Sequence, residues 1–172
     1  MRRIALCSLL WLLICAVVVS CATKKKETKP DWPECAGAFF SIKYPPGFSV
    51  RRSMDGRDPE NAWESAYFTS PDKSVEFYVF APRWDGDPKD IALDPKREVK
   101  ASQKTVRDKY GSTRWTTIRA RDGSYTRSIV AKLNKHGGTW LAFQIRYRDA
   151  RAYAKYEADY KRFKSSVVVI GE

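Results

Sequence analysis

The chain has 172 residues, which is enough for one ordinary domain and too few for two. Hydrophobic residues make up 43% of it and aromatic residues 13%, which excludes a disordered protein beyond the first segment. The formal net charge is +12, which favours anionic neighbours such as membrane headgroups, acidic polymers or nucleic acid, or else a basic surface that only water solvates.

The first 21 residues have the pattern of a targeting segment. Two arginines precede an apolar run over residues 4–19, and small residues follow it. The sequence VVSC at residues 18–21 resembles the bacterial lipobox, which predicts cleavage before Cys21 and attachment of lipid to it. One alternative is an uncleaved membrane anchor, because the apolar run approaches the roughly 17 residues needed to span a bilayer. The other alternative is a plain secretory leader.

This interpretation divides the chain into a signal peptide (residues 1–20), a lipid-anchored basic tether (21–35) and a single globular domain (36–172). The lysines of the tether would each add about 1 kcal/mol of attraction to an anionic leaflet. Ala22 is not the aspartate associated with inner-membrane retention in some enteric bacteria. We therefore expect a cell-envelope location, at the outer membrane facing the periplasm in a Gram-negative host.

The cysteines and the histidine give no metal or disulfide pattern. Cys7 and Cys15 leave with the leader and Cys21 carries lipid, so Cys35 is the remaining thiol, either buried or paired with another molecule. His136 has no co-ligands at metal-site spacing. We expect no metal and no cofactor.

Period-two alternation and turn residues predict the strands of a sheet. The predicted strands are residues 39–44, 48–51, 63–69, 74–81, 113–121, 124–134 and 139–148. The turns at residues 70–73 and at Asp122 and Gly123 are short enough to join their neighbours into hairpins.

Two helices are expected. Asp94 and Pro95 have the pattern of an N-cap and first helical residue, and Gly111 of a C-terminal stop, which predicts a helix over residues 95–110 with a thin apolar stripe. Asp149 is the expected N-cap of the second helix. Its apolar stripe, at intervals of three and four, is predicted to pack in the core and consists of Tyr153, Tyr156, Tyr160, Phe163 and Val167.

The turn at Asp122 and Gly123 sets Arg119 opposite Thr126 and Ile118 opposite Arg127. If the loop at residues 135–137 is odd in length, Leu141, Phe143 and Ile145 share the core face with Ile118. The opposite face would then be polar and would bring Arg119 and Arg146 to either side of Thr126. Its candidate anion- or partner-binding residues are Arg119, Arg121, Arg146, Lys132, Trp115 and Trp140. Alternatively, helix 95–110 covers this face and its carboxylates pair with the arginines.

The order of these elements resembles the PsbP-like family. The segments that carry the resemblance are FSIKYPPGFSV, YFTSPDKSVEFYVF, GSYTRSIVAKLNKHGGTWLAFQIRY and AYAKYEADYKRFKSS, within residues 39–169. That family includes an extrinsic subunit of photosystem II and bacterial lipoproteins of unassigned role, and it shares its fold with a nuclear-transport factor. The resemblance implies an α+β fold, with a central antiparallel β-sheet and helices on both faces (an α/β/α sandwich). It also implies docking on larger assemblies.

Three functions are compatible with these patterns. The first is a non-enzymatic envelope lipoprotein that binds or assembles a membrane-associated protein complex, with membrane lipid as a second partner through Cys21. The second is binding of an anionic envelope polymer by interleaved arginines and tryptophans, for which an envelope location argues against nucleic acid. The third is an enzyme, which is disfavoured because the sequence shows no nucleophile and base pair and no phosphate loop.

Overall fold

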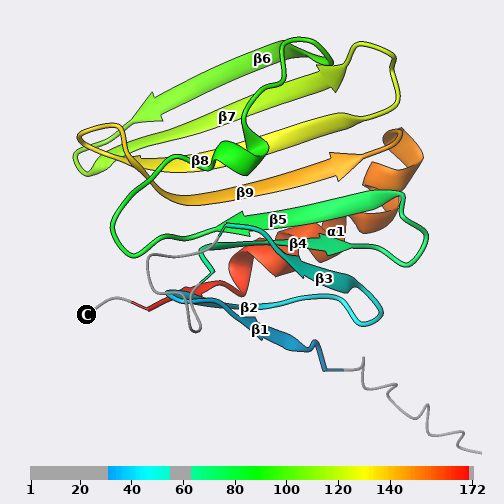
Figure 1. Cartoon of the computed structure of the whole chain (residues 1–172), viewed down its shortest axis with the longest axis horizontal. Helices are drawn as coiled ribbons and strands as arrows, with labels where there is room; N and C mark the ends of the chain where they lie inside the picture. Colours follow the sequence, from blue (N-terminus) through cyan, green and yellow to red (C-terminus); the bar gives the residue numbers. More distant parts are fainter. Residues whose placement is uncertain (1–30, 55–62, 171–172) are drawn as a thin grey trace, which may run out of the picture.

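The computed structural model describes residues 31–54 and 63–170, so the predicted signal peptide and Cys21 lie outside the described residues. Its main element is a seven-stranded antiparallel sheet (Figure 1). Across the sheet, the strands are β3 (Ser49–Arg52), β4 (Ser65–Thr69), β5 (Val75–Phe80), β9 (Thr139–Tyr147), β8 (Thr126–Asn134), β7 (Gly111–Ala120) and β6 (Glu98–Arg107). A small sheet beside β3 consists of β1 (Glu34–Ala36), β2 (Phe40–Lys43) and β10 (Val168–Val169). The predicted strands before residue 82 and after residue 112 are confirmed.

Helix α1 (Ala150–Ser165) covers one face of the sheet behind β4, β5 and β9 (Figure 1). As predicted, Asp149 caps it, accepting a hydrogen bond from the backbone N–H of Ala152 at 2.8 Å. The aromatic stripe packs in the core, where the ring of Phe163 is fully buried. Its ring centroid lies 5.0 Å from that of Phe68 and 5.3 Å from that of Phe77. We call this side the helix-side face.

The predicted helix over residues 95–110 is wrong, because most of this segment forms the edge strand β6. Asp94 does accept hydrogen bonds from the backbone N–H groups of Arg97 and Glu98, but only one turn results. The segment is too poor in apolar residues to bury a helical stripe, whereas β7 offers it a full ladder of backbone hydrogen bonds.

The other face is covered by an irregular segment, residues 81–97, which we call the strap. It contains one 3-10 turn, η1 (Lys89–Ile91), and crosses in front of the sheet in Figure 1. Ile91 is buried there against a second core cluster that includes Tyr78, Phe80 and Leu133. The expectation of helices on both faces is therefore wrong: α1 is the one α-helix of the described residues, and the strap lies opposite it on the strap-side face.

The pairing of β7 with β8 confirms the register predicted from the first hairpin. Arg119 pairs with Thr126 and Ile118 with Arg127. The turn itself is longer than the predicted two residues: the N–H of Ala120 donates to the carbonyl of Tyr125, the N–H of Gly123 donates to the carbonyl of Ala120, and Gly123 has a positive φ of 74°.

The pairing of β8 with β9 contains an irregularity that reverses the predicted faces. Leu133 pairs with Thr139, which agrees with an odd loop, but Lys132 already pairs with Leu141. Trp140 is the extra residue, so it forms a β-bulge that shifts the pairing by one position. A shift of one residue turns every later side chain of β9 to the other face.

The predicted neighbourhood of Arg119 and Arg146 is therefore wrong. Arg119 shares the helix-side face with Thr126, which in turn pairs with Tyr147. Arg146 pairs with Arg127 on the strap-side face. Leu141, Phe143 and Ile145 pack under the helix and not beside Ile118.

The ordered fold begins before the predicted end of the tether. Trp32 is only 8% exposed, with the guanidinium of Arg162 4.3 Å from its ring centroid, and β1 starts at Glu34. Cys35 is half-buried and is the free cysteine of the described residues. Burial raises the pKa of its thiol to about 11, with Arg52 opposing the shift. Within residues 31–54 and 63–170, no helix has the length and apolar character needed to cross a membrane.

Replacing Phe163 tests the packing of α1 on the sheet. We expect Phe163→Ala to lower the free energy of unfolding by about 3–5 kcal/mol, because it removes a fully buried ring and leaves a cavity. Denaturant unfolding measures this loss. A loss below about 1 kcal/mol would contradict the packing, and Lys161→Ala, on the exposed side of the same helix, is the control.

Candidate binding surface

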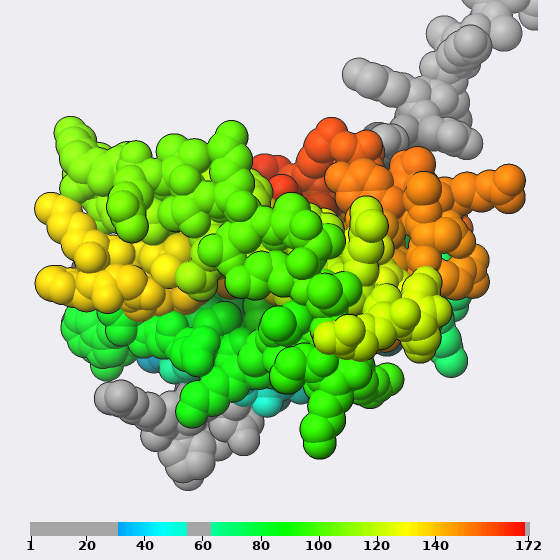
Figure 2. Space-filling view, turned by 90° about the horizontal axis from the view of Figure 1, so that it is seen from above, coloured from blue at the N-terminus to red at the C-terminus, as the bar shows by residue number. Residues whose placement is uncertain are grey.

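One end of the sheet extends beyond α1, and the strap covers only part of it. It comprises β6, β7, β8 and their turns (residues 99–135), and we call it the basic wing. Ten of its residues are Lys or Arg and two are Asp. Figure 1 shows no helix over β6 and β7, and Figure 2, which looks down on this end, shows the light-green side chains of β6 at the surface. Every residue of β6 after Glu98 is exposed.

Four of the six predicted binding residues lie on the helix-side face of the wing and its border with β9. Trp115 is 40% exposed and pairs with Lys104 of β6. Lys132 lies over the ring of Trp140, with its ammonium 5.1 Å from the ring centroid. Arg119 is exposed on the same face. The structure therefore brings together Arg119, Lys132, Trp115 and Trp140.

Arg121 and Arg146 do not join this group. Arg121 lies at the hairpin turn, where its backbone N–H bonds to the carbonyl of Arg97 and its Nε to the carbonyl of Pro95. Arg146 is on the strap-side face, stacked on Tyr125 with 3.8 Å from its guanidinium carbon to the ring centroid. It borders two hollows with volumes of about 330 and 180 Å³.

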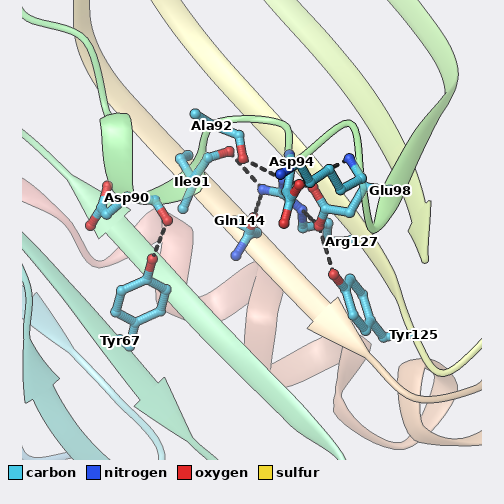
Figure 3. A network of polar contacts seen from close by, with 10 residues as sticks. Tyr67, Asp90, Ile91, Ala92, Asp94, Glu98, Tyr125, Arg127 and Gln144 are labelled. Atoms are coloured by element: carbon cyan, nitrogen blue, oxygen red, sulfur yellow. Dashed lines mark hydrogen bonds and ion pairs between the residues drawn. The ribbon is translucent and has the colours of Figure 1, made fainter. Parts of the chain in front are cut away.

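The smaller hollow is bordered by a buried polar network centred on Arg127 (Figure 3). The Arg127 side chain is 6% exposed and donates to both carboxylate oxygens of Glu98, from Nε at 2.8 Å and from Nη2 at 2.6 Å. It also donates to the carbonyl oxygens of Ile91 and Ala92 and to the side-chain oxygen of Gln144. All five N–H groups of the guanidinium are thereby used.

Glu98 is held as an anion by this network. Burial raises the pKa of its carboxyl, but the hydrogen bonds from Arg127, from the backbone N–H of Asp94 and from Tyr125 outweigh burial and bring the pKa to about 2. Arg127 and Glu98 thus satisfy one another and leave no free donor for a ligand.

A second set of contacts holds the strap at Asp90, the residue before Ile91. The carboxylate of Asp90 accepts hydrogen bonds from Tyr78 at 2.6 Å and Ser65 at 3.0 Å, and its backbone carbonyl accepts one from Tyr67. Burial, together with the nearby charge of Asp90, raises the pKa of Tyr67 and Tyr78, so both tyrosines stay protonated and keep donating. The contacts of Asp90 and those of Arg127 together form what we call the strap-side centre, which holds the strap on the sheet.

Arg127 was not among the predicted site residues, although the sequence contained a signal for it. The first hairpin register set it opposite Ile118 on the core face, where an arginine requires a buried carboxylate partner. Glu98 could not be recognised as that partner while its segment was interpreted as a helix. The described residues contain no group of three or more His, Cys, Asp or Glu that could hold a metal ion, and His136 is exposed in a turn.

No protein-family model and no curated protein matches the sequence. Among solved structures, the chain is similar to the cyanobacterial PsbP of Synechocystis, with 10% identity and a TM-score of 0.47 over 81% of this chain and 92% of that one. It is similar to the Ran-binding protein Mog1p of Saccharomyces cerevisiae, with 10% identity and a TM-score of 0.39 over 81% and 97%. A Bacteroides thetaiotaomicron protein has 16% identity and a TM-score of 0.38 over 84% and 50%.

These structures include the PsbP and Mog1 folds that the sequence resembles. At such identities the likeness concerns the fold alone and says nothing of partner or activity. Membership among the bacterial lipoproteins stays a prediction.

Replacing Arg127 tests the buried pair. We expect Arg127→Met to lower the free energy of unfolding at pH 7 by about 3–5 kcal/mol, because it leaves the Glu98 carboxylate buried without its partner. Denaturant unfolding measures the loss, and Arg114→Met on the neighbouring strand is the control.

The pH dependence of unfolding gives a second measurement of the same pair. The folded pKa of Glu98, about 2, lies below its unfolded value, so the carboxylate stabilises the fold above the unfolded pKa of 4.5 and this contribution is lost as pH falls through about 2. The Arg127→Met variant should lack that acid-side contribution. An unchanged acid-side slope together with a small loss at pH 7 would contradict the network.

Proposed function

We propose that the protein is a non-enzymatic binding or assembly module of the cell envelope, held at a membrane by lipid on Cys21. It docks through the basic wing on an acidic surface of a membrane-associated protein complex. The observation that carries the proposal is the exposure of the wing: β6 is exposed after Glu98, the wing carries an excess of positive charge, and α1 lies over neither β6 nor β7, although Ile118 and Ala120 at one end of β7 are buried.

Glu98 neutralises Arg127, but the wing has no carboxylate placed to neutralise its other nine cations. Of its two aspartates, Asp108 accepts hydrogen bonds from the backbone N–H groups of Tyr110 and Gly111, and Asp122 accepts two from Ser124, from its backbone N–H and its hydroxyl. Both therefore serve the turns at the ends of β7. A surface with one sign of charge attracts an oppositely charged partner over about 8 Å at physiological salt and directs its approach.

The wing also offers apolar contact area among its charges. On the helix-side face, Val99 is 45% exposed, Val106 46% and Trp115 40%. Tryptophan and arginine are the residues most enriched among the energetically important contacts of protein interfaces. Exposed valines, a tryptophan and arginines on one surface therefore favour a protein-binding role for the wing over a surface that only solvent contacts.

The absence of an enzymatic role belongs to the same proposal. The polar groups of the strap-side centre satisfy one another. A general base or nucleophile needs a free lone pair aimed at substrate, which this arrangement does not offer.

Binding of an anionic envelope polymer is the second candidate. It rests on the stacking of Lys132 over Trp140 beside the exposed Trp115 and Arg119, since a ring and a cation side by side suit a sugar-phosphate or phospholipid headgroup.

A charge-reversal pair tests the wing. We expect Lys104→Glu combined with Arg119→Glu to weaken binding of the full chain to soluble poly-glutamate by about tenfold or more, because two exposed cations of the wing become anions. Fluorescence anisotropy at two salt concentrations measures the affinity. The matched control is Lys43→Glu combined with Arg151→Glu, two exposed cations outside the wing.

Equal losses in the two double variants would contradict the proposal, because the net charge and not the wing would then control binding. A wing that binds vesicles with anionic headgroups or wall polymer but not poly-glutamate would favour the second candidate.

The membrane attachment is tested by Cys21→Ser. We expect this change to abolish lipidation and to move the protein from the membrane fraction to the soluble fraction, because a single thiol carries the anchor. Metabolic labelling with a fatty acid and fractionation measure the two effects, and Cys35→Ser is the control. A Cys21→Ser protein that keeps its leader and stays in the membrane would support the uncleaved anchor instead.

A further inference from the structure

The outer side of β6 is a free strand edge. β6 is the last strand of the seven-stranded sheet and pairs with β7 alone. The pairing skips Ala101, because Lys100 is opposite Ile118 and Ser102 is opposite Thr117. Beyond this bulge, residues 102–107 form an uninterrupted ladder with β7, so their outer side offers a regular template for another strand.

The turn after β6 shows which backbone groups of that template are free. The backbone N–H of Asp108 donates to the carbonyl of Gly111 at 3.0 Å, so these two residues form a hydrogen-bonded pair. In an antiparallel ladder such pairs alternate with pairs that are not hydrogen-bonded. Ser102, Lys104 and Val106 therefore bond to β7. The residues that direct N–H and C=O groups outward are Gln103, Thr105 and Arg107.

The side chains of this edge are basic and partly apolar. Lys104 and Val106 lie on the helix-side face beside Trp115, whereas Lys100 and Arg107 lie on the strap-side face. The one carboxylate of β6, that of Glu98, is buried against Arg127. A strand laid along the edge would meet cations on both of its faces and an apolar contact at Val106.

A second copy of this chain does not fit the edge. Pairing β6 with β6 would gather Lys100, Lys104 and Arg107 from both copies with no exposed carboxylate on either strand, and like charges side by side on a sheet are destabilising. The described chain does not supply the strand either. Both of its ends lie beside β1 and β10, at the far side of the molecule from β6 (Figure 1).

We infer that β6 binds an extended acidic segment of a partner protein by strand addition, with Gln103, Thr105 and Arg107 supplying the backbone hydrogen bonds and Lys100, Lys104 and Arg107 selecting for acidic side chains. This inference rests on the proposed function and gives it a geometry. Exposed lysines and a bulge protect an edge from indiscriminate pairing. The same lysines repel basic strands but attract a strand of opposite charge, so the edge selects for acidic partners.

The experiment uses the full chain in detergent micelles and a fluorescein-labelled peptide of alternating glutamate and valine. Fluorescence anisotropy measures the affinity, and amide hydrogen exchange followed by NMR measures protection. On binding, the amides of Gln103, Thr105 and Arg107 should become protected. Those of Lys104 and Val106, already bonded to β7, should change little.

Thr105→Pro removes one outward N–H without removing a bond to β7, and an edge strand tolerates proline at such a position. We expect it to weaken peptide binding by about tenfold, whereas Thr105→Ala, which keeps the N–H, should change the affinity by less than about twofold. If Thr105→Pro does not fold, the exchange measurement on the unaltered chain tests strand addition by itself, through the protection of the three outward amides.

The outcomes separate the two proposals. Peptide binding that leaves the three outward amides unprotected, but is weakened by Lys104→Glu, would overturn strand addition and leave docking by the basic wing intact. A chain that binds poly-glutamate but not the peptide would also overturn strand addition alone. Binding of neither probe, with the fold intact, would overturn both.

Discussion

The ion pair between Arg127 and Glu98 is the interaction on which the strap-side face depends. Removing two charges from water costs several kcal/mol for each ion, and only a close pair with every remaining polar group satisfied offsets that cost. Arg127 meets this condition, with one carboxylate, two backbone carbonyls and one amide oxygen around it. Two of its acceptors belong to the strap, so the pair fixes the segment in place.

This dependence follows from what covers the sheet. A helix brings its own backbone hydrogen bonds to a sheet face and needs only an apolar stripe to pack, as α1 shows with Tyr156, Tyr160 and Phe163. The strap has one short 3-10 turn, so the carbonyls of Ile91 and Ala92 need partners from the sheet. The buried arginine supplies them, and Asp90 adds a second attachment through Tyr67 and Tyr78. The strap crosses only part of the sheet, which leaves β6 exposed after Glu98 and most of β7 exposed or partly exposed.

Much of the fold could be predicted because local signals determine it. The cap at Asp149, the aromatic stripe and the hairpin register around Gly123 depend on signals within a few residues, and each is confirmed. β6 could not be predicted, since the cap-like pair at Asp94 and Pro95 is a local signal that pairing with β7 overrides. Arg146 was assigned to the wrong face because the bulge at Trp140 leaves no mark in the sequence. The site residues in β7 and β8 depended on the first hairpin alone, and their register is correct.

The buried pair also links the strap to the basic wing. Glu98 is the first residue of β6, and its backbone N–H bonds to the carbonyl of Asp94 while its carboxylate accepts from Asp94, Tyr125 and Arg127. The rest of β6 is exposed and buries almost no apolar area of its own, so the ladder to β7 and this anchor at its start are what hold it. An edge strand anchored at one end and open along its length can stay ordered before a partner arrives. Binding then need not supply the conformational entropy of ordering β6, which is the condition under which a small charged edge can bind with useful affinity.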